Sequence, residues 1–94
     1  MTYVIITGPN CKWCEKAKDA LDDAQVPWVL FSTDTQYSGP TIRSFLLSNN
    51  LMSVPQVWCD GRYIGGCNEL LAHLHEELQK HKEPSLGSPS ILKD

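Results

Sequence analysis

The sequence predicts an α/β fold in which a four-stranded mixed sheet is flanked by three helices. Two apolar runs, Tyr3–Thr7 and Trp28–Phe31, enclose a helical pattern, which is typical of a parallel strand–helix–strand unit. Further along, Asp60-Gly61 separates two short strand-like runs, and this dipeptide is a strong signal for an antiparallel hairpin. Two more helical patterns complete the order β-α-β-α-β-β-α.

The composition indicates one small domain. Ninety-four residues, 41 % of them hydrophobic, suffice for one modest core. A formal net charge of -3 gives no electrostatic reason to expect nucleic acid or an anionic membrane surface as a partner. No apolar run approaches the roughly 20 residues that span a bilayer. We expect a monomeric domain at residues 1–82 and a flexible tail, rich in Pro, Ser and Gly, at residues 83–94.

The N-terminal residues and the cysteines bear on the cellular compartment. The chain enters a strand-like run at once, without a basic segment or a small-residue cleavage site, so we expect no signal peptide. We therefore expect a cytoplasmic protein. In that compartment the four cysteines favour catalysis or metal binding over structural disulfides.

The first three elements follow from residue spacing. Tyr3–Thr7 is continuous, β-branched and followed by Gly-Pro, which is typical of a buried strand. The helix predicted at residues 12–24 places small and apolar side chains at helical spacing: Ala17, Ala20, Leu21 and Ala24. Pro27 marks the break after this helix, and Trp28–Phe31 forms the second strand.

The middle of the chain predicts a loop and a short helix. Residues 33–40 are polar and rich in turn-forming residues. An amphipathic helix then begins near Pro40, which suits a first turn, and ends at Asn49-Asn50. Its apolar face follows the spacing i, i+3, i+4: Ile42, Phe45 and Leu46.

The last part of the chain predicts the hairpin and the third helix. Val54–Cys59 forms a strand in which Pro55 is tolerable only at the start or at an edge, because proline cannot donate to the ladder. After the hairpin, Gly65-Gly66 frees the backbone for unusual dihedral angles or a close approach. A helix predicted at residues 68–81 has an apolar stripe: Leu70, Leu71, Leu74 and Leu78.

The stretch Cys11-Lys12-Trp13-Cys14 lies at the junction of the first strand and the first helix, which is a redox arrangement. Free backbone N–H groups and aligned peptide dipoles place partial positive charge there, and Lys12 adds a full charge. This field favours a thiolate at Cys11. Cys14 lies about one helical turn further on, within reach of Cys11. The spacing predicts a pair that cycles between dithiol and disulfide, with Cys11 as the nucleophile and Cys14 as the resolving thiol.

Three motifs together give the chain a resemblance to the glutaredoxins, within the thioredoxin-fold superfamily, over residues 2–80. They are Cys11-Lys12-Trp13-Cys14, Val54-Pro55-Gln56 and Gly65-Gly66-Cys67-Asn68-Glu69. A CxxC pair alone is a weak signal, whereas all three motifs in this order on this pattern of strands and helices are specific. Thioredoxins share the cysteine pair and the proline but lack the double glycine. The resemblance therefore implies a thioredoxin fold and a dithiol glutaredoxin.

The resemblance also implies an activity and a binding site. A dithiol glutaredoxin reduces protein disulfides and glutathione mixed disulfides, with glutathione as co-substrate and with no metal expected. Ribonucleotide reductase is the protein client that the family implies. Pro55 would be cis, which exposes the backbone of Val54 to glutathione. From its own residue type, we also expect Trp13 to be an exposed aromatic side chain against which a substrate packs. The γ-glutamyl carboxylate would bind at the N-terminus of the last helix, near Gly66, Cys67 and Asn68.

The sequence departs from the family pattern in two places that matter for glutathione. Many glutaredoxins carry a lysine shortly before the first cysteine, which pairs with the glycyl carboxylate, but residues 8–10 are Gly-Pro-Asn. Lys12 or Arg43 could supply that charge. Asn68 stands where an aspartate is common and brings no negative charge, unless Glu69 compensates. We therefore expect weaker glutathione binding than in a typical member.

Two alternative functions remain open. One is a thioredoxin-like reductant that is fed by a thioredoxin reductase. The other is an iron–sulfur or zinc module, in which Cys59 and Cys67 complete a four-thiolate set or a cluster binds at Cys11 with glutathione across a dimer. Cys59 and Cys67 are more typical of buried thiols. The three histidines of the last helix, His73, His75 and His81, we expect on a solvated face.

Overall fold

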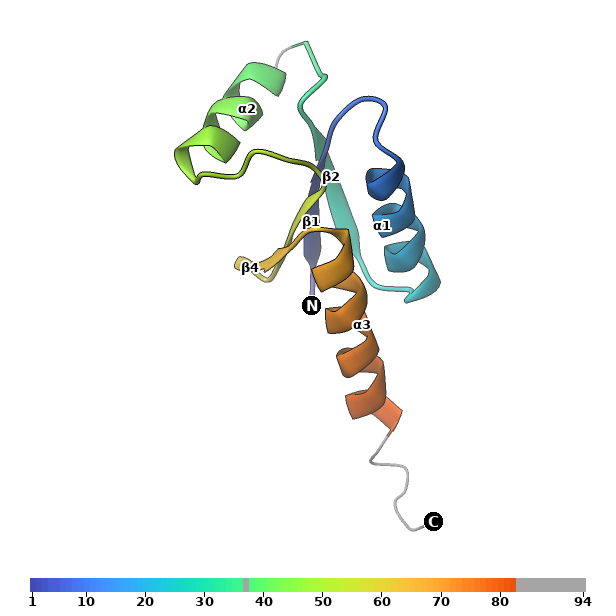
Figure 1. Ribbon diagram of the computed structural model, residues 1–94. Helices are drawn as coiled ribbons and strands as arrows, with labels where there is room; N and C mark the ends of the chain where they lie inside the picture. The colour runs from blue at the N-terminus through green and yellow to red at the C-terminus, as the bar shows by residue number, and fades with distance from the viewer. Residues whose placement is uncertain (37, 83–94) are drawn as a thin grey trace.

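The computed structural model describes residues 1–36 and 38–82, and it has the element order that the sequence predicts (Figure 1). The strands are β1 (Tyr3–Thr7), β2 (Trp28–Ser32), β3 (Gln56–Cys59) and β4 (Arg62–Gly65). The helices are α1 (Lys12–Asp23), α2 (Gly39–Ser48) and α3 (Cys67–Lys82). The predicted tail and the side chain of Leu78 lie outside the described residues. Within the described ranges, none of the helices is both long enough and apolar enough to cross a membrane.

The four strands form one mixed sheet in the order β2-β1-β3-β4. β1 pairs in parallel with β2 and antiparallel with β3, and β3 pairs antiparallel with β4. The parallel pair uses α1 as its crossover, whereas the antiparallel pair needs only a tight turn. Asp60 and Gly61 form that turn with φ values of 50° and 82°, the left-handed backbone that a two-residue hairpin loop requires. The predicted sheet, a parallel unit plus an antiparallel hairpin, is confirmed.

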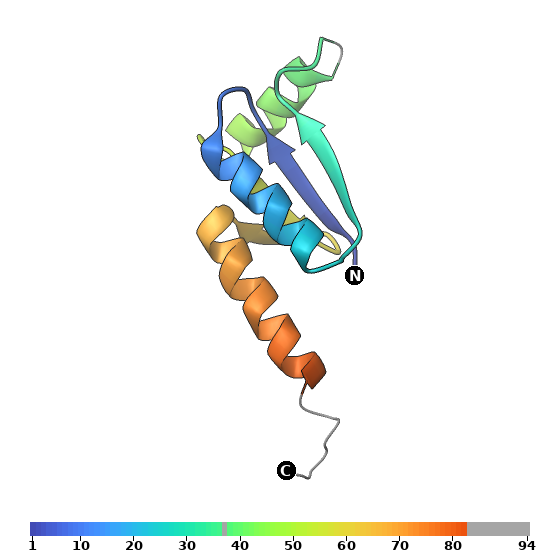
Figure 2. The same ribbon diagram turned by 90° about the vertical axis from the view of Figure 1, so that its right-hand side faces the viewer.

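The helices cover the two faces of the sheet unequally: α1 and α3 lie on one face and α2 lies on the other (Figure 2). β1 serves both faces, because successive side chains of a strand point in opposite directions. The core under α1 and α3 includes side chains with no solvent exposure: Tyr3, Ile5, Ala17, Leu21, Val57 and Leu70. The core under α2 is smaller and contains Ile6, Ile42 and Leu46.

β2 is an edge strand, and its apolar run is much more exposed than that of β1. Three consecutive side chains of β2 are between 39 % and 45 % exposed: Val29, Leu30 and Phe31. The sequence pattern of an apolar strand does not distinguish a central strand from an edge strand, because that difference depends on the strand order. The four cysteines of the chain lie elsewhere, on α1, β3 and α3 or next to them.

Candidate active site

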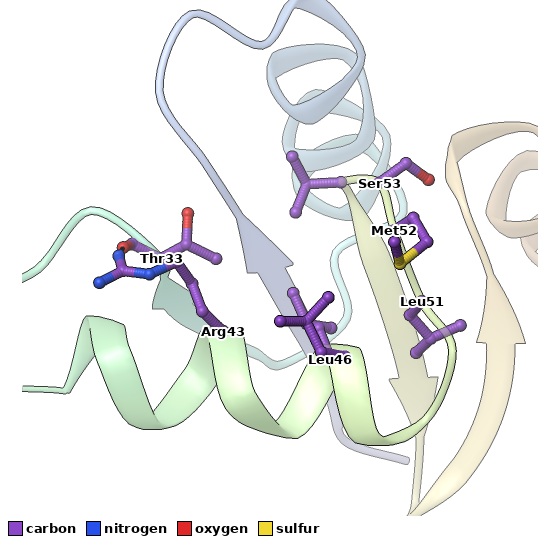
Figure 3. Close-up of a pocket in the computed structure, with 8 residues that line it drawn as sticks. Thr33, Arg43, Leu46, Leu51, Met52 and Ser53 are labelled. Carbon is purple, nitrogen blue, oxygen red and sulfur yellow. Dashed lines mark hydrogen bonds between the residues drawn. The ribbon is translucent and has the colours of Figure 1, made fainter.

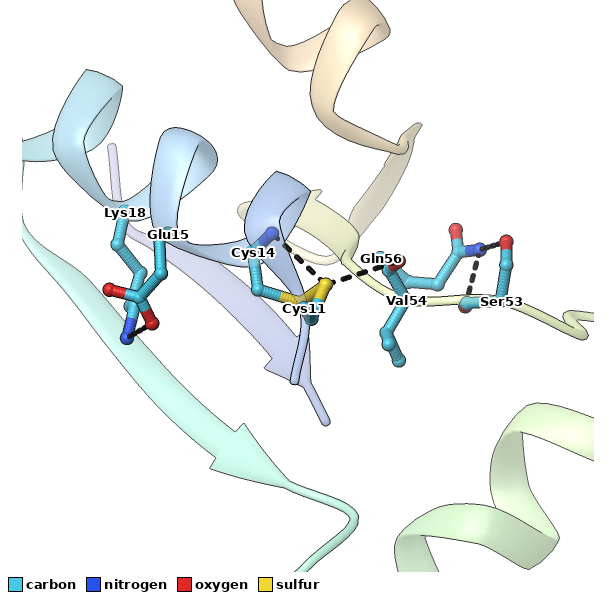
Figure 4. The surroundings of a disulfide bond; sticks show 7 residues. All are labelled: Cys11, Cys14, Glu15, Lys18, Ser53, Val54 and Gln56. Atoms are coloured by element: carbon cyan, nitrogen blue, oxygen red, sulfur yellow. Dashed lines mark hydrogen bonds and ion pairs between the residues drawn. A yellow bond between two sulfur atoms is a disulfide. The ribbon is translucent and has the colours of Figure 1, made fainter. Parts of the chain in front are cut away.

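Cys11 and Cys14 are joined in a disulfide at the N-terminus of α1 (Figure 4). The loop after β1 turns at Asn10, whose φ of 53° is left-handed, and Cys11 then has extended backbone as the N-cap of the helix. Cys11 Sγ accepts a hydrogen bond from the backbone N–H of Cys14 at 3.1 Å. A backbone donor of the first helical turn therefore points at the sulfur on which a thiolate's charge would develop.

The two cysteines differ in their access to solvent. Cys11 is half-buried, whereas Cys14 is only 1 % exposed. Their Cα atoms lie 5.2 Å apart, the ordinary separation for a disulfide. An external disulfide can approach Cys11, and Cys14 can reach Cys11 from inside the protein. This geometry fits the predicted roles of a nucleophile and a resolving thiol.

An aromatic surface and two cations lie beside the cysteine pair on α1. Trp13 is 53 % exposed, and Lys16 Nζ lies over its ring at 5.2 Å from the centroid, which is a cation–π contact. Lys12 is also exposed. By contrast, Lys18 forms an ion pair with Glu15 at 2.7 Å (Figure 4). The start of α1 thus presents a flat apolar face and positive charge next to Cys11.

The loop before β3 brings peptide backbone to the reactive sulfur. The Val54–Pro55 peptide bond is cis, so the prediction for Pro55 is confirmed. The carbonyl oxygen of Val54 lies 3.6 Å from Cys11 Sγ, and a reduced Cys11 thiol can donate to it. A peptide that extends along Val54 would consequently carry its own cysteine to Cys11.

A buried glutamine holds this loop in position. Gln56 Nε2 donates to the carbonyl oxygen of Ser53 at 2.9 Å and to Ser53 Oγ at 3.3 Å (Figure 4). Gln56 Oε1 accepts a hydrogen bond from the Tyr63 hydroxyl at 2.5 Å, and the Tyr63 ring packs on Trp58. Gln56 belongs to one of the sequence motifs, but this role could not be inferred from it, because Tyr63 comes from the neighbouring strand.

A carboxylate folds back over the N-terminus of α3. Gly66 is the N-cap, and its backbone N–H donates to Glu69 Oε1 at 2.8 Å, which is half of a capping box. Gly65 has a φ of 132°, and a Cβ at that position would lie 2.8 Å from Glu69 Cβ. The first glycine of the motif is therefore required by both backbone angle and space. The sequence alone could have indicated this contact, because Glu69 lies three residues after Gly66.

A groove of about 270 Å³ lies beside Cys11, between α1, the cis-proline loop and the start of α3. Its lining residues are Trp13, Ser53, Val54, Pro55, Gly66, Cys67, Asn68 and Glu69. The structure therefore brings together all of the predicted glutathione- or substrate-binding residues except Lys12 and Arg43. Ser53 is the lining residue that the sequence does not single out, since a lone serine in a loop carries no distinguishing pattern.

Arg43 points away from this groove. Its guanidinium Nη1 donates to the carbonyl oxygen of Thr33, in the loop after β2. Together with Thr33 it lines a neighbouring pocket on the α2 side (Figure 3). Neither of the two cations predicted for the glycyl carboxylate of glutathione thus lines the groove.

The other two cysteines are buried free thiols, as the sequence indicates. Burial raises the pKa of the Cys67 thiol, Lys16 opposes this rise and Glu69 adds to it. Cys67 consequently stays protonated at neutral pH although it lines the groove. Within residues 1–36 and 38–82, no three His, Cys, Asp or Glu side chains gather closely enough to hold a metal ion.

The expectation of a solvated histidine face on α3 is wrong for His73. Its ring is half-buried, and its Nε2 is hydrogen-bonded to the Tyr3 hydroxyl at 2.9 Å. The two rings also meet edge to face, with centroids 5.6 Å apart. The physical reason is that Tyr3 projects from β1 toward α3, which the sequence of the helix alone does not reveal. His75 is exposed, and the side chain of His81 lies outside the described residues.

The fold and the site together define a class of protein. A thioredoxin-like sheet that carries a cysteine pair at the N-terminus of its first helix, opposite a cis-proline loop, is the arrangement of a thiol–disulfide oxidoreductase. The family model described as Glutaredoxin matches residues 3–64. The chain belongs to the glutaredoxin family.

Known relatives and solved structures agree with this assignment. Glutaredoxin-1 of Rhizophagus irregularis is 32% identical over 63 residues, which cover 66% of this chain and 62% of that protein. Glutaredoxin 1 of Rickettsia felis is 28% identical over 95 aligned positions, which cover 93% of each chain. The buckwheat glutaredoxin–glutathione complex superposes with a TM-score of 0.70 at 20% identity, over 94% of this chain and 81% of that chain, and so shares the fold.

Proposed function

We propose that this oxidoreductase is a dithiol glutaredoxin that uses glutathione to reduce protein disulfides and glutathione mixed disulfides. The observation that carries the proposal is the groove that leads from Cys11, past the cis bond before Pro55, to the N-terminus of α3. It offers an accessible sulfur, a stretch of backbone and an aromatic flank within one short cleft. We place the reaction in the cytoplasm, where the glutathione pool keeps thiols reduced.

The reaction has two thiol–disulfide exchanges. In the first, the Cys11 thiolate attacks one sulfur of the substrate disulfide, forms a mixed disulfide with it and releases the other sulfur as a thiolate. In the second, Cys14 attacks the Cys11 sulfur and releases the bound substrate as a thiol. The Cys11–Cys14 disulfide that results is reduced by two glutathione molecules, which leave as glutathione disulfide. When Cys11 carries glutathione, one further glutathione molecule resolves that mixed disulfide directly.

Glutathione binding would use groups on both sides of Cys11. The backbone of Val54 would pair with the cysteinyl residue of the tripeptide. Glu69 supplies the negative charge that Asn68 lacks for the γ-glutamyl ammonium, because its carboxylate lines the groove and is held there by Gly66. The γ-glutamyl carboxylate would accept hydrogen bonds from free backbone N–H groups of the first turn of α3. The buckwheat protein that shares this fold was solved as a glutathione complex.

The lack of a cation in the lining of the groove favours a different electron donor, a thioredoxin reductase. Residues 8–10 contain no lysine, Lys12 is not among the lining residues, and Arg43 donates to Thr33 instead. The glycyl carboxylate of glutathione therefore meets no cation in the lining of the groove. Weak glutathione binding would favour a thioredoxin reductase as the source of electrons.

The test is the turnover of a small glutathione mixed disulfide, followed as NADPH oxidation in the presence of glutathione and glutathione reductase. We expect turnover by the native protein and only the uncatalysed background in Cys11→Ser, because no other thiol is both accessible and placed at the groove. We expect Cys14→Ser to keep this activity, since glutathione itself resolves the Cys11 mixed disulfide, but to lose reduction of protein disulfides.

A parallel assay with thioredoxin reductase and NADPH separates the two donors. Turnover with glutathione alone supports the proposal, and turnover with thioredoxin reductase alone assigns the chain to the second donor. Full activity of Cys11→Ser in either assay would contradict the placement of the nucleophile. Circular dichroism of each variant shows whether the fold is intact.

A further inference from the structure

An apolar pocket adjoins the catalytic groove on the side of α2 (Figure 3). It has a volume of about 250 Å³ and lies between α2, Thr33 and the loop that leads to the cis-proline. Its lining residues are Thr33, Arg43, Leu46, Leu47, Leu51, Met52, Ser53 and Val54. We call this pocket the α2 pocket.

The α2 pocket shares part of its lining with the catalytic groove. Ser53 and Val54 line both of them. The carbonyl oxygen of Val54 lies 3.6 Å from Cys11 Sγ, so the pocket begins at a residue that touches the reactive sulfur. A molecule held in a disulfide with Cys11 and extending along Val54 would therefore pass over the mouth of the pocket.

The α2 pocket is lined mainly by apolar side chains, some from the small core under α2 and others exposed to solvent. Met52 is 81 % exposed and Leu47 is 59 % exposed, whereas Leu46, which also lines the pocket, is buried. A group of large exposed apolar side chains beside a reactive site is typical of a surface that binds a partner. Met52 suits this use, since its unbranched thioether side chain adapts to differently shaped partners.

The charge of the α2 pocket also restricts its occupant. Arg43 is the one ionisable side chain among the lining residues, and its guanidinium already donates to the carbonyl oxygen of Thr33. The remaining lining consists of aliphatic side chains, Met52 and two hydroxyl-bearing side chains. An uncharged apolar group is therefore the best match.

Glutathione cannot fill this pocket, because none of its three residues has a bulky apolar side chain. A polypeptide can. In an extended chain neighbouring residues are about 3.3 Å apart, so a side chain one or two positions from the attacked cysteine lies within about 7 Å of it along the chain. Because Val54 both contacts Cys11 and lines the α2 pocket, such a side chain can reach the lining of the pocket.

We propose that the α2 pocket is a client subsite, which takes a bulky apolar side chain one or two residues from the disulfide cysteine of a polypeptide substrate. The inference rests on thiol–disulfide exchange at Cys11 but not on glutathione as the electron donor. The subsite adds no chemical step: it holds the client while its cysteine is bonded to Cys11, and so raises kcat/KM for matching sequences.

The test uses five synthetic decapeptides, each closed by one internal disulfide and identical except at four positions. The reference peptide has serine at the four positions that lie one and two residues on either side of the first cysteine. Each of the others has a leucine at one of these positions. Pre-reduced protein is mixed with each peptide in single-turnover experiments, and the appearance of peptide thiols gives the rate without any glutathione.

We expect at least one leucine peptide to be reduced about tenfold faster than the serine peptide, the discrimination typical of an apolar contact in an open pocket. In the double variant Leu47→Gln/Met52→Gln we expect this preference to fall below about twofold. Glutamine keeps the helix propensity of Leu47 in α2 and roughly the side-chain length of both exposed residues, and Met52 lies in the loop after the helix. Val29→Ser is the matched control, because it removes exposed apolar surface on β2, outside the lining of the pocket.

Equal rates for all five peptides would overturn the subsite, and so would a preference that survives in the double variant. The double variant should also turn over the small glutathione mixed disulfide as fast as the native protein, which shows that Cys11 is unaffected. A different result tests the proposed glutathione dependence. If the native protein prefers a leucine peptide but shows no turnover with glutathione, the subsite stands and glutathione is not the electron donor.

Discussion

The two faces of the sheet differ in how completely helices cover them. Under α1 and α3, side chains from the sheet and from both helices reach zero exposure, among them Ile5, Leu21 and Leu70. Under α2, the core is limited to a few side chains, and Phe31 and Phe45 remain 45 % exposed. An apolar groove of about 520 Å³ stays open on that side, between α2 and the sheet.

The difference follows from helix length and number. Two helices of 12 and 16 residues pack against one face, whereas a single helix of 10 residues covers part of the other. Cys11 belongs to the well-covered half, which can hold a sulfur rigidly. Val54 and Met52 come from the loop that leaves α2. The active site therefore lies where a well-packed half positions Cys11 and the loop from the open half brings Val54 to it.

The largest expected effect on stability comes from truncating the covered face. Leu70→Ala should lower the free energy of unfolding by about 3 kcal/mol, because it removes a fully buried side chain and leaves a cavity. Phe45→Ala on the open face should cost about 1 kcal/mol, since nearly half of that ring is already in water. Urea unfolding at neutral pH measures both. Equal costs for the two variants would remove the distinction between the faces.

A smaller effect concerns the Tyr3–His73 contact within the covered face. Burial, reinforced by the neighbouring Cys59, raises the pKa of the Tyr3 phenol above its ordinary value of 10.0. The folded protein therefore keeps this proton at pH values where the unfolded chain has released it. The stability that this provides is fully present below about pH 10 and is lost as the pH rises further.

Tyr3→Phe should cost about 1 kcal/mol at pH 7, because it removes the hydrogen bond to His73. Above about pH 10 the native protein should lose more stability than the variant does, since the variant has no phenol to ionise. Cys67, whose pKa is also raised, contributes the same alkaline loss to both proteins. Parallel pH profiles of native and variant would argue against a buried phenol at this position.

The fold could be predicted from the sequence largely because its signals are local. The β-branched run at residues 3–7, the Asp60-Gly61 turn and the helical spacing of the apolar residues each specify one element. The exposure of β2 could not be predicted, because it depends on the order of strands in the sheet. The contact of His73 with Tyr3 cannot be predicted for a similar reason, because the two residues are 70 positions apart in the chain.

The candidate site divides in a similar way. Cys11, Val54 and Asn68 lie in short motifs, so the resemblance to a family could place them at one groove. The sequence places Arg43 near that groove through its helix alone, whereas the loop length before α2 decides where its guanidinium reaches. The role of Gln56 depends on hydrogen bonds from two other segments, which no linear pattern encodes.

The most direct test of the central claim is the alkylation of the fully reduced protein with one equivalent of iodoacetamide at pH 7, followed by mass spectrometry of its peptides. Cys11 alone combines solvent access with the donors of a helix N-terminus, while the other three thiols are 5 % exposed or less. We predict that Cys11 takes up the label at least about tenfold faster than any other cysteine. Preferential labelling of Cys14, Cys59 or Cys67 would contradict the account.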